Sequence, residues 1–165
     1  MLQFLGLKPG MHVLDLFGGN AYWAEIMAPV VGPKGHDTVW EPTQFYSDKT
    51  KASFAALMAK HPNVSIVSSP FEDPAASLPK NYADLVILND NYHDTYWQNA
   101  KYKIPQMDPN AFLKAVYASM KPGAVIGSST MLRTRTATLV PPSRSCTGSI
   151  PKSSRRTSSA PALCS

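Results

Sequence analysis

The chain has 165 residues and a net charge of +5, and this length predicts one globular domain rather than two. From residue 128 to the end there are six Lys or Arg and no Asp or Glu, so residues 1–127 are close to neutral and the basic charge lies in the C-terminal part. Cys146 and Cys164 also lie there, which excludes a disulfide framework or a cysteine metal site in the domain. There is no apolar run of the roughly 20 residues that cross a bilayer and no visible export signal, so we expect a soluble, cytoplasmic protein.

The first half of the domain predicts two strand–helix units. Residues 11–17 are apolar enough for a buried strand, and residues 22–31 carry apolar side chains at helical spacing until a Gly/Pro-rich stop at 32–35. A second strand is expected at 37–41 and a second helix at 47–60. The side chains expected to face inward from this second helix are Phe54, Ala55, Leu57 and Met58.

The second half continues the alternation. Strands are expected at 64–67 and 83–88, followed by a helix that begins at Asp108 and runs through Met120. A turn at 121–123 then leads into a fifth strand at 124–127. The helix is expected to bury Phe112, Leu113, Val116 and Tyr117. Such alternation predicts an α/β domain with a mostly parallel sheet.

Residues 128–165 differ in composition, with ten Ser, six Thr, five Arg and four Pro and little periodic apolar content. This composition predicts a disordered tail and an incomplete sheet. The abrupt change at residue 128 also predicts a shifted reading frame or an aberrant C-terminus. Two interpretations of the tail stay open: it contacts nucleic acid or accepts phosphate through basic stretches such as 155–159, or it has no selected role.

The stretch DLFGGNAY, residues 15–22, lies at the first strand-to-helix turn, where open parallel sheets bind nucleotides. Its two glycines either admit a ligand or serve helix–strand packing alone. The stretch lacks the G-x-G-x-x-G spacing of dinucleotide sites, which makes an NAD-dependent oxidoreductase the third choice. Asp15 would repel phosphate but accepts hydrogen bonds from a cationic amino acid group, and Glu41, at the end of the second strand, suits the two hydroxyls of a ribose. These residues fit an adenosyl amino acid better than NAD.

The stretch VLDLFGGNAYWAEIMAPVVGPKG, together with VWEP, resembles the first two motifs of class I S-adenosylmethionine-dependent methyltransferases. It looks closest to a group of predicted bacterial methyltransferases with an aromatic pair after the glycine turn, here Tyr22 and Trp23, and a Tyr-His-Asp after the fourth strand, here residues 92–94. Residues 121–123 are similar to the family's turn into the fifth strand. The resemblance covers residues 1–127 and implies a Rossmann-like three-layer α/β sandwich whose C-terminal strands are missing.

The resemblance implies S-adenosylmethionine as the cofactor and no metal site. Asp15 and the backbone of residues 18–20 would hold its methionine part, Glu41 its ribose, and Pro42 with Phe71 its adenine. The family pattern D-x-G-x-G-x-G places glycines at 17, 19 and 21, where only 19 is glycine here, and Asn20 is expected to keep the turn by accepting a left-handed backbone. The candidate cofactor residues are Asp15, Phe17, Gly18, Gly19, Asn20, Tyr22, Glu41, Pro42, Phe71 and Asn89.

Residues 88–97, LNDNYHDTYW, follow the fourth strand, where such methyltransferases position the methyl acceptor. His93 is a candidate general base, because histidine exchanges protons near neutral pH, and Asp94 is a candidate to orient it. The alternative is a hydrogen-bonded pair that only stabilises the loop. A small-molecule acceptor is expected, since the neutral domain has no evident basic groove. The alternative function is a non-catalytic Rossmann-like binding module whose basic tail contacts nucleic acid or protein.

Overall fold

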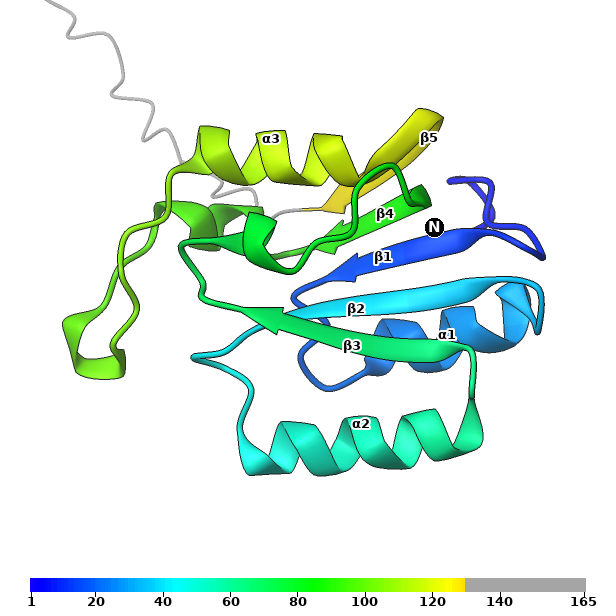
Figure 1. Cartoon of the computed structure of the whole chain (residues 1–165), viewed down its shortest axis with the longest axis horizontal. Helices are drawn as coiled ribbons and strands as arrows, with labels where there is room; N and C mark the ends of the chain where they lie inside the picture. Colours follow the sequence, from blue (N-terminus) through cyan, green and yellow to red (C-terminus); the bar gives the residue numbers. More distant parts are fainter. Residues whose placement is uncertain (130–165) are drawn as a thin grey trace, which may run out of the picture. The chain divides into compact units, whose positions relative to one another are not determined.

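The computed structural model describes residues 1–129, which form a five-stranded sheet with helices on both faces (Figure 1). The strands are β1 (His12–Leu16), β2 (His36–Pro42), β3 (Val64–Ser69), β4 (Ala83–Asn89) and β5 (Met120–Ser129). The α-helices are α1 (Tyr22–Val31), α2 (Asp48–Lys60) and α3 (Pro109–Ser119), and the single turns of 3-10 helix are η1 (Pro74–Ala76), η2 (Tyr92–Tyr96) and η3 (Ala100–Tyr102). Within the described range, no helix is both long enough and apolar enough to span a membrane.

All strand pairs are parallel, and the strands lie in the order β3-β2-β1-β4-β5. Helices α1 and α2 cover one face of the sheet and α3 covers the other (Figure 1). Side chains alternate between the faces along β1: Leu14 and Leu16 join the cluster on the α3 side, whereas Val13 packs with Met27 of α1. The predicted three-layer α/β sandwich is therefore confirmed.

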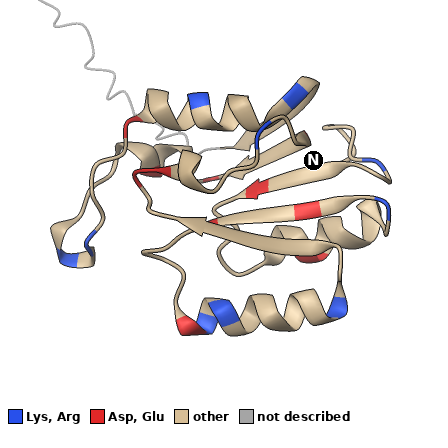
Figure 2. Ribbon diagram, in the orientation of Figure 1, with Lys and Arg blue, Asp and Glu red and all other residues tan. Residues whose placement is uncertain are grey.

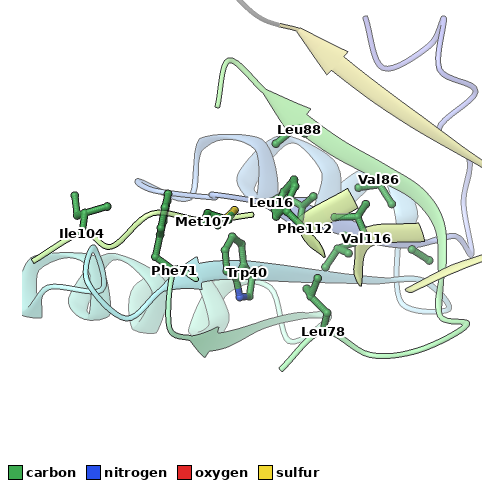
Figure 3. Packing of buried hydrophobic residues seen from close by; sticks show 12 residues of the cluster. Leu16, Trp40, Phe71, Leu78, Val86, Leu88, Ile104, Met107, Phe112 and Val116 are labelled. Atoms are coloured by element: carbon green, nitrogen blue, oxygen red, sulfur yellow. The ribbon is translucent and has the colours of Figure 1, made fainter. Parts of the chain in front are cut away.

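The core on the α3 side is rich in aromatic rings near the ends of β1 and β2. Trp40, Phe71 and Phe112 are fully buried there, and Figure 3 shows them packed between the sheet and the loops. Trp40 also donates a hydrogen bond from its indole nitrogen to Ser69 Oγ at 2.9 Å, which ties β2 to the end of β3. This cluster lies directly beneath the edge at which β1 and β2 end.

Three side chains that were expected to be buried are exposed instead. They are Ala55 on α2 and Leu113 and Tyr117 on α3, and Tyr117 is 79% exposed. Apolar spacing identifies a helical segment, but the strands beneath decide which sector of the helix faces the sheet. In α3 that sector carries Phe112 and Val116.

The predicted turn at 121–123 is wrong. Strand β5 begins at Met120 directly after α3, and its pairing with β4 slips between Ala83 and Leu85. Gly123 takes a left-handed φ of 82° there, so Pro122 and Gly123 form an irregular first part of the strand rather than a separate turn. The strand runs to Ser129, two residues beyond the predicted limit, and the remaining tail with both cysteines lies outside the described residues.

Candidate functional site

The candidate site lies where the strand order reverses. The chain passes from β1 outward to β2 and β3 and then returns to β4 on the other side of β1. The loops that follow the neighbouring strands β1 and β4 therefore lead away from each other. Ligands in open α/β sheets bind at such a point, outside the carboxyl ends of the strands. A cavity of about 260 Å³ lies here, lined by Leu16, Phe17, Gly18, Gly19, Asn20, Tyr22, Trp23, Asn89 and Asn91.

The glycine turn is left-handed at three alternating positions. Phe17, Gly19 and Ala21 have φ values of 57°, 52° and 67°, and these are the positions at which the resembled pattern carries glycine. Asn20 is not among the residues with positive φ, so the expectation that it would absorb the left-handed conformation is wrong. Its side chain instead accepts a hydrogen bond from Tyr22 N at 3.3 Å and helps to start α1. A left-handed conformation at a non-glycine residue costs about 1–3 kcal/mol, so this turn holds strain at two positions.

The two glycines have different roles. A methyl group at Gly18 would overlap Val39 Cγ1 and would lie 3.3 Å from Asp15 Oδ2, so packing against β2 requires glycine there. A methyl group at Gly19 would meet only Phe17 O, at 3.7 Å, and Gly19 is exposed. The packing interpretation thus accounts for Gly18, while Gly19 leaves open space beside the cavity.

Both predicted acidic residues lie at the turn. Glu41 is only 4% exposed, and its Oε2 accepts a hydrogen bond from Gly19 N at 2.9 Å. Burial raises the pKa of Glu41, and the Gly19 hydrogen bond partly opposes this. Asp15 is also buried, and its Oδ2 has no hydrogen-bond partner in the described structure. Burial, reinforced by the nearby carboxyl groups of Asp37 and Glu41, raises the pKa of Asp15 well above its usual value.

Asp37 is a third carboxyl group on this face of the sheet, and the sequence analysis missed it. It lies opposite Val13 of β1, is fully buried, and neither of its carboxyl oxygens has a partner among the described residues. Burial raises its pKa to about 7. The signal was available in the sequence, because Asp37 precedes Val39 and Glu41 at the period of 2 that places strand residues on one face.

The loop after β4 brings polar groups to the other side of the cavity. Asn89 Oδ1 accepts a hydrogen bond from Ser129 Oγ at 2.7 Å, so the end of β4 is fixed to β5. Asn91, also missed by the sequence analysis, lines the cavity and donates from Nδ2 to Asp94 Oδ2 at 3.0 Å. His93 Nε2 lies 3.5 Å from Asp94 Oδ1, and the His93 side chain is about half exposed. The loop therefore holds a chain of polar contacts from Asn91 through Asp94 to His93.

The candidate catalytic pair does not line the cavity at the glycine turn. His93 and Asp94 instead border a separate shallow hollow of about 400 Å³ with Tyr96 and Trp97. The basic residues of the described chain are all Lys, and they are spread over turns, helices and strand β5 (Figure 2). The surface beside His93 is open and partly aromatic.

The candidate adenine residues are enclosed. Pro42 is buried at the end of β2, and Phe71 is fully buried with its ring centroid 6.1 Å from that of Phe17. The 260 Å³ cavity is smaller than the usual 300–1,000 Å³ of a pocket for a small organic ligand. Gly19 lines the cavity and is exposed, whereas Asp15, only 1% exposed, lies beneath the turn and does not line the cavity. The adenosyl part of S-adenosylmethionine has no open path to Glu41 or Phe71 in this conformation, since both side chains are enclosed.

No family model matches the sequence, and no curated protein matches it. Among solved structures, a SAM-dependent methyltransferase from Aquifex aeolicus aligns with a TM-score of 0.59 and 23% identity over 77% of this chain and 60% of that one. An arsenic(III) S-adenosylmethionine methyltransferase from Chlamydomonas reinhardtii aligns with a TM-score of 0.57 and 24% identity, over 76% of this chain and 40% of that one. The chain has the fold of these methyltransferases.

The same fold also occurs in a protein with another reaction. The cyclase SpnF aligns with a TM-score of 0.54 and 18% identity, over 78% of this chain and 42% of that one. Fold alone therefore does not establish the reaction, which must be argued from the site. The chain spans less than two thirds of the length of each of these three structures.

Proposed function

We propose that this chain is an S-adenosylmethionine-dependent methyltransferase domain that acts on a small-molecule acceptor. The observation that carries the proposal is the contact between Gly19 N and Glu41 Oε2, which joins the glycine turn to the acidic end of β2 at the switch point of the sheet. Asp15, buried beside them with an unpartnered oxygen, adds an acceptor for a cationic amino group. The methyltransferase fold supports the same proposal.

In this proposal the chain binds and orients the cofactor, which supplies a methyl group on a cationic sulfur. Asp15 and the backbone of residues 18–20 hold the amino acid end, Glu41 the ribose, and Pro42 with Phe71 the adenine. Tyr22 and Asn89 line the cavity and limit the position of the bound end. Holding the reacting atoms in line accounts for much of the rate of such a displacement.

His93 is proposed as the general base that removes the proton from an acceptor hydroxyl or amine. Asp94 accepts a hydrogen bond from Asn91 and lies beside His93, so it is placed to orient the imidazole and to stabilise its protonated form. The acceptor would lie in the hollow between His93 and Trp97.

A second candidate function is a non-catalytic binding module with the same fold. The enclosure of Glu41 and Phe71 favours it, because a domain that never admits the adenosyl group has no need of an open path to these residues. In that case the hollow beside His93 and the basic tail would contact a partner instead.

Calorimetric titration of the full chain with S-adenosylhomocysteine tests these alternatives. We expect saturable binding by the wild type, weakened at least about tenfold by Asp15→Asn and by Glu41→Gln, since each replaces a carboxyl group proposed to accept hydrogen bonds from the ligand. Asp48→Ala is the matched control, because that carboxyl group is fully exposed on α2. Absence of binding by a folded wild-type chain would refute the methyltransferase proposal and leave the binding module.

A further inference from the structure

Phe17 separates the cavity from the candidate adenine residue. On one side, Phe17 lines the 260 Å³ cavity at the glycine turn. On the other side its ring packs edge-on against Trp40 with centroids 4.9 Å apart, and its centroid lies 6.1 Å from that of Phe71. A third ring, Phe112, lies 5.9 Å away. A ligand in the cavity therefore meets Phe17 before it can reach Phe71.

The same short segment also closes the candidate ribose residue. Glu41 is 4% exposed, and its carboxyl group is held by Gly19 N, two residues after Phe17. Both enclosed residues are thus covered by contacts from residues 17–19.

Phe17 has a backbone conformation that glycine adopts more easily. Its φ of 57° is left-handed, and its N–H donates to Trp40 O at 2.9 Å, which holds the backbone at this position. The ring is only partly buried, unlike those of Trp40 and Phe71. Among the rings of this cluster, Phe17 is the one that lines the cavity and also lies next to the candidate adenine residue.

We propose that Phe17 closes the adenine side of the site, so that a ligand in the cavity reaches Phe71 only when the Phe17 ring leaves the aromatic cluster. This inference rests on the proposed function. The apparent affinity is then reduced by the fraction of molecules in which the ring has turned out. The chain combines a cavity for the amino acid end with an aromatic side chain that controls access to the rest.

Replacement of Phe17 tests the inference by calorimetry with S-adenosylhomocysteine on the full chain. Phe17→Gly removes the ring and suits the left-handed backbone, so binding should tighten at least about tenfold if less than a tenth of the wild-type molecules are open. Phe17→Leu is the matched control, because it keeps a branched apolar side chain between the cavity and Phe71, and its affinity should stay near that of the wild type. Circular dichroism establishes that each variant is folded.

A second measurement does not depend on removing the ring. Trp23→Phe with Trp97→Phe leaves Trp40 as the sole tryptophan, and Trp40 packs directly on Phe17. Saturation with S-adenosylhomocysteine should change the Trp40 emission because the neighbouring ring leaves. L-methionine, which needs only the open cavity, should leave the emission unchanged.

The outcomes separate this inference from the proposed function. Equal affinity of wild type and Phe17→Gly, or binding of S-adenosylhomocysteine without a change in Trp40 emission, overturns the closure by Phe17 and leaves the methyltransferase proposal intact. Failure of the folded wild type to bind refutes the proposed function and the inference with it. Tighter binding by Phe17→Gly but not by Phe17→Leu supports both.

Discussion

The buried carboxyl group of Asp37 predicts that the domain loses stability as the pH rises. Asp37 is fully buried, both of its oxygens lack a partner in the described part of the chain, and its pKa is raised to about 7. The folded state therefore holds a proton that the unfolded chain releases above about pH 4. By linkage, the state that binds more protons is favoured at low pH, so the contribution is fully present below about pH 4 and is lost as the pH rises to about 7.

The size of this effect follows from the raised pKa. Each pKa unit between the folded and unfolded states is worth about 1.4 kcal/mol, so ionising Asp37 destabilises the fold by about 4 kcal/mol in total and by roughly 2.5 kcal/mol between pH 5 and pH 8. Asp37→Asn keeps the shape of the neutral side chain and removes the titration. We therefore expect the stability of Asp37→Asn relative to the wild type to increase by roughly 2.5 kcal/mol from pH 5 to pH 8.

Urea unfolding of the two proteins at pH 5, 6, 7 and 8 provides the measurement, with equal m-values required for a valid comparison. Asp15 titrates on the same face and is coupled to Asp37, but it is present in both proteins, so most of its contribution cancels in the difference. A difference in unfolding free energy that stays constant across this pH range would show that Asp37 does not titrate there, and the argument from burial would fail.

Three further predictions concern packing and hydrogen bonds. Gly18→Ala should lower the unfolding free energy by about 1–3 kcal/mol because the added methyl group overlaps Val39. Adding Val39→Ala should recover part of this loss. A wild-type melting temperature for Gly18→Ala would contradict the close approach of Gly18 to Val39. Asn63→Ala should lower the unfolding free energy, measured in urea, by about 1–3 kcal/mol. The reason is that Asn63 Nδ2 donates to two carbonyl oxygens at the end of α1, at 2.8 and 3.0 Å. An unchanged unfolding free energy would mean that water replaces both hydrogen bonds. Burial alone would raise the pKa of Asp84, but hydrogen bonds, chiefly from Lys121 Nζ at 2.8 Å, lower it. Asp84→Asn should therefore destabilise the chain at neutral pH and lose this effect as the pH falls below about 4, whereas a pH-independent effect would exclude the ion pair as its cause.

Local sequence signals predicted the order of elements because each depends on near neighbours. The cap at Asp108 is formed by its own side chain, which accepts from Asn110 N at 2.9 Å, and the continuous apolar run of β4 reflects burial on both faces. The exposure of Leu113 and Tyr117 was not predictable in this way, since it depends on the direction from which α3 meets the sheet.

The candidate site was predicted in its residues but not in its shape. Asp15, Gly19 and Glu41 meet as expected, because the carboxyl ends of parallel strands share one edge. The position of the Phe17 ring depends on rings contributed by later segments, at Phe71 and Phe112, and no pattern around residue 17 indicates it. Sequence spacing therefore predicts which residues meet at this edge but not how the side chains around them pack.

Part of the energetic cost of this fold lies at the edge that holds the candidate site. Phe17 and Ala21 hold left-handed backbones, and Asp15 carries an unpartnered oxygen in the interior. Each feature destabilises the chain, and glycine or an apolar residue at these positions would remove the penalty. Packing explains Gly18 but none of these three residues. Because strain and unsatisfied polar groups persist where function requires them, their occurrence together within residues 15–21 favours a ligand site over a turn that serves packing alone.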